Sequence, residues 1–443
     1  MYKKVWNLLS QKINSPIRKK IAINTLWILA DRNLRMILGF IIGVWTARYL
    51  GPLGYGAINY TLSVYTLFAI ISTLGLESVL IHRIISLPNE SHTFLGTGFL
   101  LRLAASGIAF LGMILIGVIQ NDWHVLSILF FIMAPALLLQ SFDIIEWYFQ
   151  SKMNIAKPII IRSSIYIVSN IAKIAILLTN GNIMYFMAVS SLEISLIAIS
   201  LYTIFRKQYP KFNLHFDFRI AKALLQEGWP FLISTLSYMI YTRIDQIMLG
   251  IFFNPTQVGT YTAATKVTDI FLGILIAMST ALFPLLSRWH GENKAYFYYR
   301  LAQLTSIITF ISYGIFILFC LSGPYLFREI FGEAYAASIP ILYIQMFGLI
   351  FLYNGALRSS YLTLIKKQKL LMWTTVSAAI INIMLNLFLI PKFGGIGAAI
   401  ATCITQVYAL FISNFFISST QKLFRIQVSA LIGIPLFSKK GLF

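Results

Sequence analysis

Charged residues are scarce in this sequence. They make up 11% of the 443 residues, and hydrophobic residues make up 58%. A soluble domain carries roughly 25% charged residues. The sequence therefore supplies too little charge to cover a water-soluble fold of this length. The composition instead predicts a polytopic membrane protein in which nearly the whole chain serves the bilayer.

The sequence contains only two cysteines and no recognisable catalytic motif. The two cysteines, Cys320 and Cys403, lie in apolar segments and fit neither a disulfide framework nor a metal-ligand spacing. The five histidines form no metal-ligand cluster, and no Ser-His-Asp order or nucleotide fingerprint is present. The glycine-rich run 394–399 lacks a following Lys-Ser/Thr, so it favours close helix contact rather than phosphate binding. We predict no catalytic residue, no metal site and no cofactor.

Acidic residues are few compared with basic ones. The sequence has 14 Asp and Glu against 35 Lys and Arg, which gives a formal net charge of +21. A charge of this sign and size could indicate a nucleic-acid partner. The basic residues gather, however, in alternate loops between apolar runs, as the positive-inside rule predicts. We therefore attribute the charge to membrane topology and predict no nucleic-acid partner.

Apolar runs of about 20 residues or more predict membrane-spanning helices. Twelve such runs follow one another with short loops between them. They are expected near residues 21–49, 55–82, 94–120, 124–150, 158–179, 183–205, 228–251, 257–287, 299–320, 338–364, 370–390 and 394–418. The fold class predicted is an all-α polytopic membrane protein of about twelve transmembrane helices.

The loop charges predict the orientation of these spans. With a cytoplasmic N-terminus, 24 Lys and Arg lie in the tails and loops of that side, including six in residues 1–20. Only Arg48, Arg328 and Lys392 then lie on the opposite side. This bias predicts that both termini are cytoplasmic. Basic loops alternate with loops that carry little charge. A missed helix would place the following basic loops on the wrong side, so the bias also supports twelve spans.

The longest cytoplasmic loop, near residues 206–227, predicts a division into two bundles of six helices. The first covers 1–210 with a basic cytoplasmic tail, and the second covers 211–443 with a short cytoplasmic or interfacial tail. Pro52 and Gly56 begin one span, and Pro255 and Gly259 begin its counterpart in the second half. Because six is an even number, both halves start on the same side. The pattern indicates a parallel repeat about a pseudo-two-fold axis along the membrane normal.

Fifteen ionisable residues fall inside the predicted spans, where each charge costs at least about 2.5–3.5 kcal/mol. We assign most of the basic ones to an anionic substrate, since Arg binds phosphate bidentately and Lys supplies a point charge. Arg102, Lys173 and Arg358 lead this set, because none has an opposite charge within one helical turn. The predicted substrate-binding residues are Arg32, Arg35, Arg102, Lys173, Arg243, Lys266 and Arg358.

Buried carboxylates can change protonation state during a transport cycle, so they are candidates for ion coupling. The predicted ion-coupling residues are Asp31, Glu146, Asp245 and Asp269. The alternative is that these charges form ion pairs that hold helices together. Helical spacing favours the pairs Asp31–Arg35 and Lys266–Asp269. We interpret Arg162, Glu77 and Glu193 as mainly structural.

Several segments resemble one protein family. Residues 47–56 (ARYLGPLGYG) resemble the signature at the first hairpin of bacterial polysaccharide flippases. Residues 258–264 (VGTYTAA) resemble the opening of their eighth helix, and Phe283-Pro284 fits its end. Residues 394–402 resemble the start of their twelfth helix. Over nearly its whole length the chain is similar to Wzx-type O-antigen flippases of the MATE-like MOP superfamily.

The resemblance implies two six-helix bundles in the bacterial inner membrane. It implies that an undecaprenyl-diphosphate-linked oligosaccharide is the substrate, moved from the cytoplasmic to the periplasmic leaflet by ion-coupled alternating access. Expected partners are this lipid-linked glycan, the lipid bilayer, a glycan polymerase and a chain-length regulator. Three alternatives stay open: a multidrug or cation exporter of the same superfamily, a membrane-embedded glycan polymerase or ligase, and a scaffold for glycan assembly.

Overall fold

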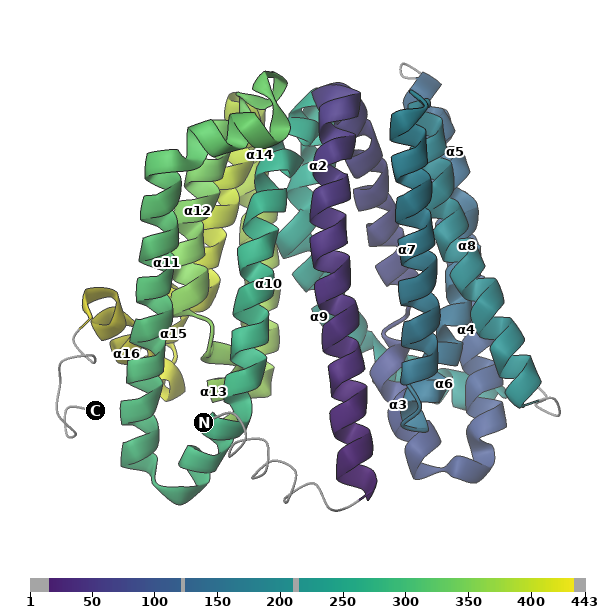
Figure 1. Ribbon diagram of the computed structural model, residues 1–443. Helices are drawn as coiled ribbons and strands as arrows, with labels where there is room; N and C mark the ends of the chain where they lie inside the picture. Colours follow the sequence, from purple (N-terminus) through teal and green to yellow (C-terminus); the bar gives the residue numbers. More distant parts are fainter. Residues whose placement is uncertain (1–15, 121–123, 210–214, 434–443) are drawn as a thin grey trace. The chain divides into compact units, whose positions relative to one another are not determined.

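Apolar runs fold as helices because, in lipid, every backbone N–H and C=O group needs a partner within the chain. The computed structural model describes residues 16–120, 124–209 and 215–433 (Figure 1). Within these ranges every regular element is helical. Most of the predicted basic tail lies outside the described residues. The all-α fold predicted from the sequence is confirmed.

The longer helices carry most of the chain. They are α2 (Pro16–Ser72), α4 (Ser91–Ile119), α5 (His124–Leu139), α7 (Ala156–Leu178), α8 (Ile183–Gln208), α9 (Phe218–Phe252), α10 (Pro255–Glu292), α11 (Lys294–Phe331), α12 (Ser338–Asn354) and α14 (Gln368–Val407). Short helices connect or extend them. They are α3 (Leu76–Ser86), α6 (Ile144–Ser151), α13 (Arg358–Leu364), α15 (Ser413–Phe416) and α16 (Gln421–Ile432). Single turns are η1 (Pro88–Glu90), η2 (Gln140–Asp143), η3 (Glu333–Tyr335), η4 (Tyr408–Ile412) and η5 (Ser418–Thr420).

These helices account for all twelve predicted spans. In the described part of the chain, nine helical segments are long and apolar enough to cross a membrane. Two of the nine, Trp27–Ser86 and Gln368–Phe416, have 60 and 49 residues. One crossing needs about 20 residues, so each is more than twice as long as one crossing requires. Each therefore carries two predicted spans. The remaining span, 228–251, lies in helix α9, which is not among these nine segments.

Glycine divides both double-length segments. Gly51 has φ 65° and ψ 177°, and Gly394 has φ 56° and ψ −133°, so both leave the helical conformation. A side chain would strain a backbone of this kind, which explains glycine at these positions. Pro52 follows Gly51 directly and suits the first turn of a new helix, where its missing N–H needs no partner.

The chain forms two compact units. The N-terminal unit contains residues 1–43 and 64–233, and the C-terminal unit contains residues 44–63 and 234–443. Each unit therefore includes a short segment from the other half of the sequence. The predicted bundle boundary between residues 210 and 211 stays a prediction.

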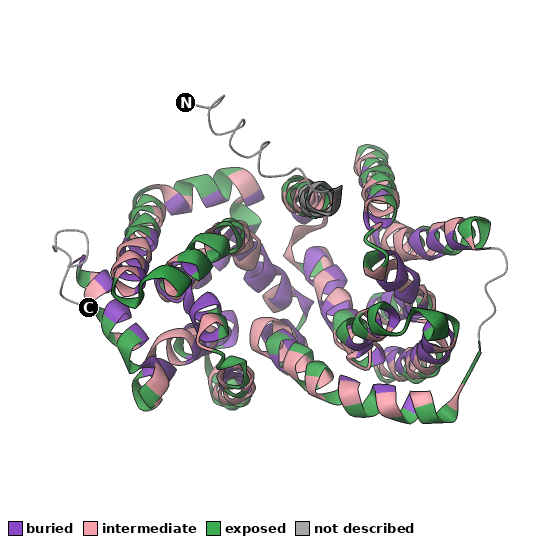
Figure 2. Ribbon diagram, turned by 90° about the horizontal axis from the view of Figure 1, so that it is seen from below, coloured by how far each residue is buried: buried purple, intermediate pink, exposed green. Residues whose placement is uncertain are grey.

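Each unit packs an apolar core and exposes apolar residues outside it. In the N-terminal unit, Leu80 of α3, Leu95 of α4, Phe149 of α6 and Leu201 of α8 are buried in one cluster. Helices carry buried residues on one face and exposed residues on another (Figure 2). Many exposed residues are large and apolar, such as Ile108 at 74% exposure. This distribution suits helices that face lipid tails on one side and other helices on the other.

The two repeat motifs meet inside the C-terminal unit. A Cβ atom added to Gly56 would overlap the carbonyl oxygen of Pro255, and one added to Gly259 would overlap the carbonyl oxygen of Pro52. The contact is reciprocal: each proline carbonyl lies against the glycine of the other motif. The sequence repeat thus corresponds to a backbone contact that only residues without a side chain allow.

Candidate functional site

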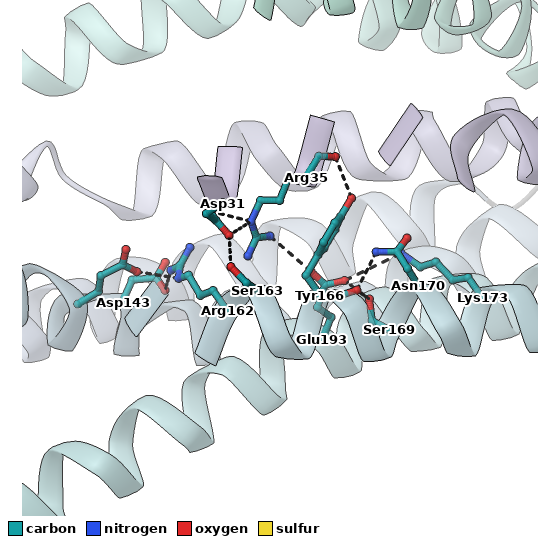
Figure 3. A network of polar contacts seen from close by, with 11 residues as sticks. Asp31, Arg35, Asp143, Arg162, Ser163, Tyr166, Ser169, Asn170, Lys173 and Glu193 are labelled. Atoms are coloured by element: carbon teal, nitrogen blue, oxygen red, sulfur yellow. Dashed lines mark hydrogen bonds and ion pairs between the residues drawn. The ribbon is translucent and has the colours of Figure 1, made fainter. Parts of the chain in front are cut away.

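The N-terminal unit holds a network of charged side chains on α2, α7 and α8 (Figure 3). Arg35 Nε lies 3.0 Å from Asp31 Oδ1, one helical turn away on α2. The Ser163 hydroxyl of α7 donates to the same carboxylate oxygen at 2.6 Å. The predicted Asp31–Arg35 ion pair is confirmed. The Arg35 guanidinium also lies 4.6 Å from the ring centroid of Tyr166.

Glu193 of α8 lies between two of the predicted substrate-binding cations. Its carboxylate oxygens are 4.0 Å from Arg35 Nη1 and 4.0 Å from Lys173 Nζ. The Ser169 hydroxyl donates to this carboxylate as well. Lys173 has no opposite charge on its own helix, but its partner comes from the neighbouring helix. Both ion pairs are long, so a more strongly charged anion could compete with Glu193 for these cations.

Arg162 of α7 forms a second group of ion pairs. Its Nη2 atom is 2.6 Å from Asp143 Oδ1, and its Nε atom is 2.7 Å from Glu146 Oε2. The bent segment from η2 into α6 brings the two carboxylates together around one guanidinium. This arrangement agrees with the structural role expected for Arg162. The predicted ion-coupling role of Glu146 stays a prediction.

Arg102 of α4 is fully buried, with 0% of its surface exposed. Its guanidinium lies 4.6 Å from the Trp147 ring centroid. Its Nε and Nη1 atoms have no hydrogen-bond partner among the described residues. Arg32, by contrast, is exposed on α2, and no carboxylate in the described part of the chain forms an ion pair with it. Arg102 is thus a buried cation held by an aromatic face, and Arg32 is a surface cation.

In the C-terminal unit, Asp245 of α9 is buried with 1% of its surface exposed. The hydroxyls of Tyr261 and Thr402 each donate to Asp245 Oδ2 at 2.5 Å. The Asn386 amide donates to Asp245 Oδ1 at 2.8 Å and to Asn382 Oδ1 at 3.0 Å. We call these five residues the Asp245 cluster. Three helices, α9, α10 and α14, contribute to it.

The Asp245 cluster contains a carboxylate and neutral groups alone. Within the described residues, no Lys or Arg forms an ion pair with Asp245. Asn386 Oδ1 and Asn382 Nδ2 are buried and have no hydrogen-bond partner there. A buried charge without a counter-ion is costly, and so is an unpaired amide. The cluster therefore has the chemistry to accept a proton or a small cation.

Asp245 was a predicted ion-coupling residue, but its partners were not predicted as site residues. Two of these partners lie in sequence segments that could have pointed to them. Tyr261 belongs to the segment 258–264 and Thr402 to the segment 394–402, both singled out for their resemblance to flippases. These motif residues converge on one carboxylate from segments more than a hundred positions apart.

Arg243 and Asp269 form an ion pair between α9 and α10. Arg243 Nη2 lies 3.0 Å from Asp269 Oδ2, and both side chains are partly exposed. Helical spacing had predicted Lys266 as the partner of Asp269. In the structure Asp269 pairs with Arg243 across the interface between the two helices, and the predicted Lys266–Asp269 pair stays a prediction. Lys266 is half-buried on α10, three residues before Asp269.

Arg358, at the start of α13, is held by neutral acceptors. It is 3% exposed. Its Nε donates to Asn414 Oδ1 at 2.8 Å, and its Nη2 donates to Thr374 Oγ1 at 3.1 Å. The buried cation thus ties α13 to α14 and α15. These contacts favour a structural role, and its predicted contact with substrate stays a prediction.

Comparison with solved structures shows which fold this chain has. The chain is similar to the lipid II flippase MurJ in an inward closed conformation, with a TM-score of 0.67, 19% identity, and 93% of this chain and 91% of that chain covered. It is also similar to an inward-facing multidrug resistance MATE family transporter of the MOP superfamily, with a TM-score of 0.65, 14% identity, and 92% and 96% covered. The fold is therefore that of the all-helical MOP transporters.

Sequence comparison gives the family. The polysaccharide biosynthesis protein family matches residues 21–290, and the MatE family matches residues 230–388. This chain belongs to the polysaccharide biosynthesis protein family. A relative is described as a probable low-salt glycan biosynthesis flippase of Haloferax volcanii, 25% identical over 211 residues. That match covers 45% of this chain and 43% of the relative, so the chain spans less than half of the relative's length.

Proposed function

We propose that this protein is a flippase for lipid-linked oligosaccharides. The observation that carries the proposal is the match to the polysaccharide biosynthesis protein family over residues 21–290. The likeness to a relative described as a glycan biosynthesis flippase supports the same substrate class. Transporters that share this fold support a transport role rather than an enzymatic one.

In this proposal the substrate is an undecaprenyl-diphosphate-linked oligosaccharide, such as an O-antigen repeat unit. The protein moves it from the cytoplasmic to the periplasmic leaflet of a bacterial inner membrane, with both termini cytoplasmic. A glycan polymerase and a chain-length regulator would act on the product. The oligosaccharide crosses the bilayer within the protein while the polyprenyl tail stays in lipid, which avoids exposing sugar hydroxyls to hydrocarbon.

The diphosphate needs positive charge along its route. The cations Arg35 and Lys173 share Glu193 at 4.0 Å each, so the substrate's phosphates can take its place as their partner. Exposed Arg32 adds a third positive charge on α2. We place phosphate binding first at these three residues. Arg102, Arg243, Lys266 and Arg358 are proposed to add to the positive potential.

Asp245 is proposed as the residue that couples transport to an ion gradient. It is buried, it has no cationic partner in the described part of the chain, and three neutral side chains donate to it. Binding a proton or a sodium ion would neutralise it, and release would restore the buried charge. Such a group can bias two conformations by its charge state. Asp31, Glu146 and Asp269 form ion pairs with Arg, so they come second to Asp245 in this role.

Export in cells tests the flippase proposal. Deleting the gene from its host should abolish surface glycan and cause the lipid-linked oligosaccharide to accumulate in the cytoplasmic leaflet. Restoring the gene should reverse both effects. Surface glycan at wild-type level in the deletion strain, in the absence of a second flippase gene, would refute the proposal. Loss of surface glycan without accumulation of the lipid-linked precursor would point to an earlier biosynthetic step.

A multidrug exporter is the second candidate, favoured by the MatE family match over residues 230–388. Such a protein would bind organic cations at unpaired acidic or aromatic groups. The two functions separate in a drug-sensitive strain that overproduces this protein. Resistance to cationic dyes or antibiotics, together with normal surface glycan after gene deletion, would favour the exporter.

A further inference from the structure

A pocket of about 190 Å³ lies in the C-terminal unit among α9, α10, α12 and α14. Its lining runs from Tyr238, which is 52% exposed, to Tyr261, which is 3% exposed. The pocket therefore extends from the surface of the unit inward to the Asp245 cluster. We call it the Tyr241 pocket, after a tyrosine in its wall.

The wall of the Tyr241 pocket is rich in uncharged hydrogen-bonding groups. Gln345 Nε2 donates to Thr265 Oγ1 at 3.1 Å, and the Thr268 hydroxyl lies 3.5 Å from Gln345 Oε1. The Tyr241 hydroxyl is buried and has no hydrogen-bond partner among the described residues. An unpaired buried hydroxyl is costly, so a ligand that bonded it would remove a penalty. Hydroxyls and amides both donate and accept, which suits a ligand that does the same.

The charges in the wall cancel. Arg243 and Asp269 both line the pocket, and they form an ion pair at 3.0 Å. Asp245 lies behind Tyr261 and Thr402, which donate to it from the same wall. The pocket therefore has no excess positive charge with which to attract phosphate. A paired guanidinium and carboxylate instead present donors and acceptors side by side, which matches adjacent hydroxyls on a neutral ligand.

The volume of the pocket and its aromatic side chains indicate more closely which class of ligand it can bind. Pockets for drug-sized molecules measure roughly 300–1,000 Å³, and this one measures about 190 Å³. The space suits a single ring rather than a larger drug or a long chain. Tyr238 and Tyr241 are neighbours, with ring centroids 6.5 Å apart, and both line the pocket. Tyrosine combines an apolar ring face with a polar hydroxyl. The ring face can pack against the C–H groups of a sugar ring, and the hydroxyl can bond to the sugar hydroxyls.

We propose that the Tyr241 pocket binds one uncharged sugar ring of the transported glycan. The inference rests on the proposed flippase function and assigns the sugar, rather than the diphosphate, to the C-terminal unit. Tyr261 and Thr402 are shared between the pocket and the Asp245 cluster. A bound sugar would therefore lie against the side chains that hold the proposed coupling carboxylate.

A natural cysteine makes the occupancy of the pocket measurable. The chain has two cysteines, and Cys403 lines the pocket whereas Cys320 does not. In the Cys320→Ser variant, reconstituted in lipid nanodiscs, Cys403 is the one thiol that a small methanethiosulfonate reagent can modify. The probes are methyl glycosides of the neutral sugars in the host's own glycan, compared with inorganic pyrophosphate. The measured quantity is the rate of Cys403 modification.

We expect at least one methyl glycoside to slow Cys403 modification several-fold and pyrophosphate to leave the rate unchanged. Gln345→Ala in the same background should remove the protection. Gln303→Ala is the matched control, because Gln303 is a glutamine that donates to the Tyr299 hydroxyl and lies on α11 outside the pocket. It should keep the protection.

Four results would overturn the inference: an unreactive Cys403, no protection by any glycoside, equal protection by pyrophosphate, or unchanged protection in Gln345→Ala. Surface glycan is scored in cells with the same variants. If the wild type exports glycan normally but no glycoside protects Cys403, the sugar-binding inference is wrong and the flippase proposal stands. If gene deletion leaves surface glycan unchanged, the flippase proposal is wrong as well.

Discussion

Ionisable residues in the membrane-spanning helices fall into two kinds of environment. In the N-terminal unit, Asp31, Glu193 and Arg162 belong to ion pairs that link α2, α6, α7 and α8. In the C-terminal unit, Asp245 and Arg358 are buried among neutral amides and hydroxyls. In an ion pair, attraction between the two charges offsets the free-energy cost of removing them from water. A buried charge without an oppositely charged partner lacks this compensation. The lone charges are therefore the ones to test first for coupling and for stability.

Asp245→Asn should abolish transport driven by an ion gradient and leave the fold intact. The amide has nearly the shape of the carboxylate, and its oxygen can still accept from Tyr261 and Thr402. It cannot bind a proton or a cation as a carboxylate does. The measurement is gradient-driven transport by purified, reconstituted protein, with thermal stability measured in parallel. Asp217→Asn changes an aspartate that accepts from backbone N–H groups at the start of α9, and it should transport normally. Gradient-dependent transport by Asp245→Asn would remove Asp245 from the mechanism.

Arg358→Met should destabilise the protein by about 1–3 kcal/mol, the cost of leaving buried polar partners unsatisfied. The substitution strands Asn414 Oδ1 and Thr374 Oγ1, which accept from Arg358 in the native structure. Thermal unfolding in detergent measures the effect. Arg32→Met, at an exposed position, is the control and should unfold like the wild type. If Arg358→Met unfolds like the wild type but fails to export glycan, Arg358 binds substrate rather than holding α13 in place.

At the level of the helices, small residues decide where segments break and where backbones meet. Gly51 and Gly394 interrupt the two longest helical segments. Gly56 and Gly259 let the helix starts after Pro52 and Pro255 touch. The repeat in the sequence is thus visible as a reciprocal contact in the C-terminal unit. Four glycines carry conformations or contacts that other residues would disturb.

Gly259→Ala should destabilise the protein by roughly 1–3 kcal/mol, the usual cost of overpacking a tight contact. Its new methyl group would overlap backbone rather than a side chain that could turn away. Gly314→Ala is the matched control, because a Cβ there meets nothing within 4 Å on α11. The control should be neutral or stabilising by up to about 1 kcal/mol, since alanine favours helix. Equal unfolding temperatures for the two variants would show that the Pro52–Gly259 contact is loose.

The number and limits of the spans could be predicted because bilayer thickness and loop charge leave few choices. Individual partners within one helix could also be predicted, as Asp31–Arg35 shows. Partners between helices could not, because they depend on how each helix is rotated in its unit. The pair of Asp269 with Arg243 of α9 and the pair of Lys173 with Glu193 of α8 are of this kind. Within the Asp245 cluster, Asp245 was predicted as a site residue. Its partners were not, since they are neutral and the segments that supply them are widely separated in sequence.

For the whole molecule, the charge bias predicts a single orientation in the membrane. Alkaline phosphatase needs disulfides that form in the periplasm, so it reports which side of the membrane a fusion point occupies. A fusion after Gly181, between α7 and α8, should be active. A fusion after Lys207, at the end of α8, should be inactive, because the following loop is predicted to be cytoplasmic. The opposite pattern would reverse the proposed topology and place the basic loops outside.

Flipping of the lipid-linked glycan in a purified system decides the whole proposal. The protein is reconstituted in liposomes with a fluorescent undecaprenyl-diphosphate oligosaccharide, and the labelled glycan that reaches the outer leaflet is followed by a membrane-impermeant quencher. Under an imposed proton or sodium gradient, we predict faster appearance with wild-type protein than with protein-free liposomes or with Asp245→Asn. Rates that are equal in all three preparations would contradict the assignment as a flippase.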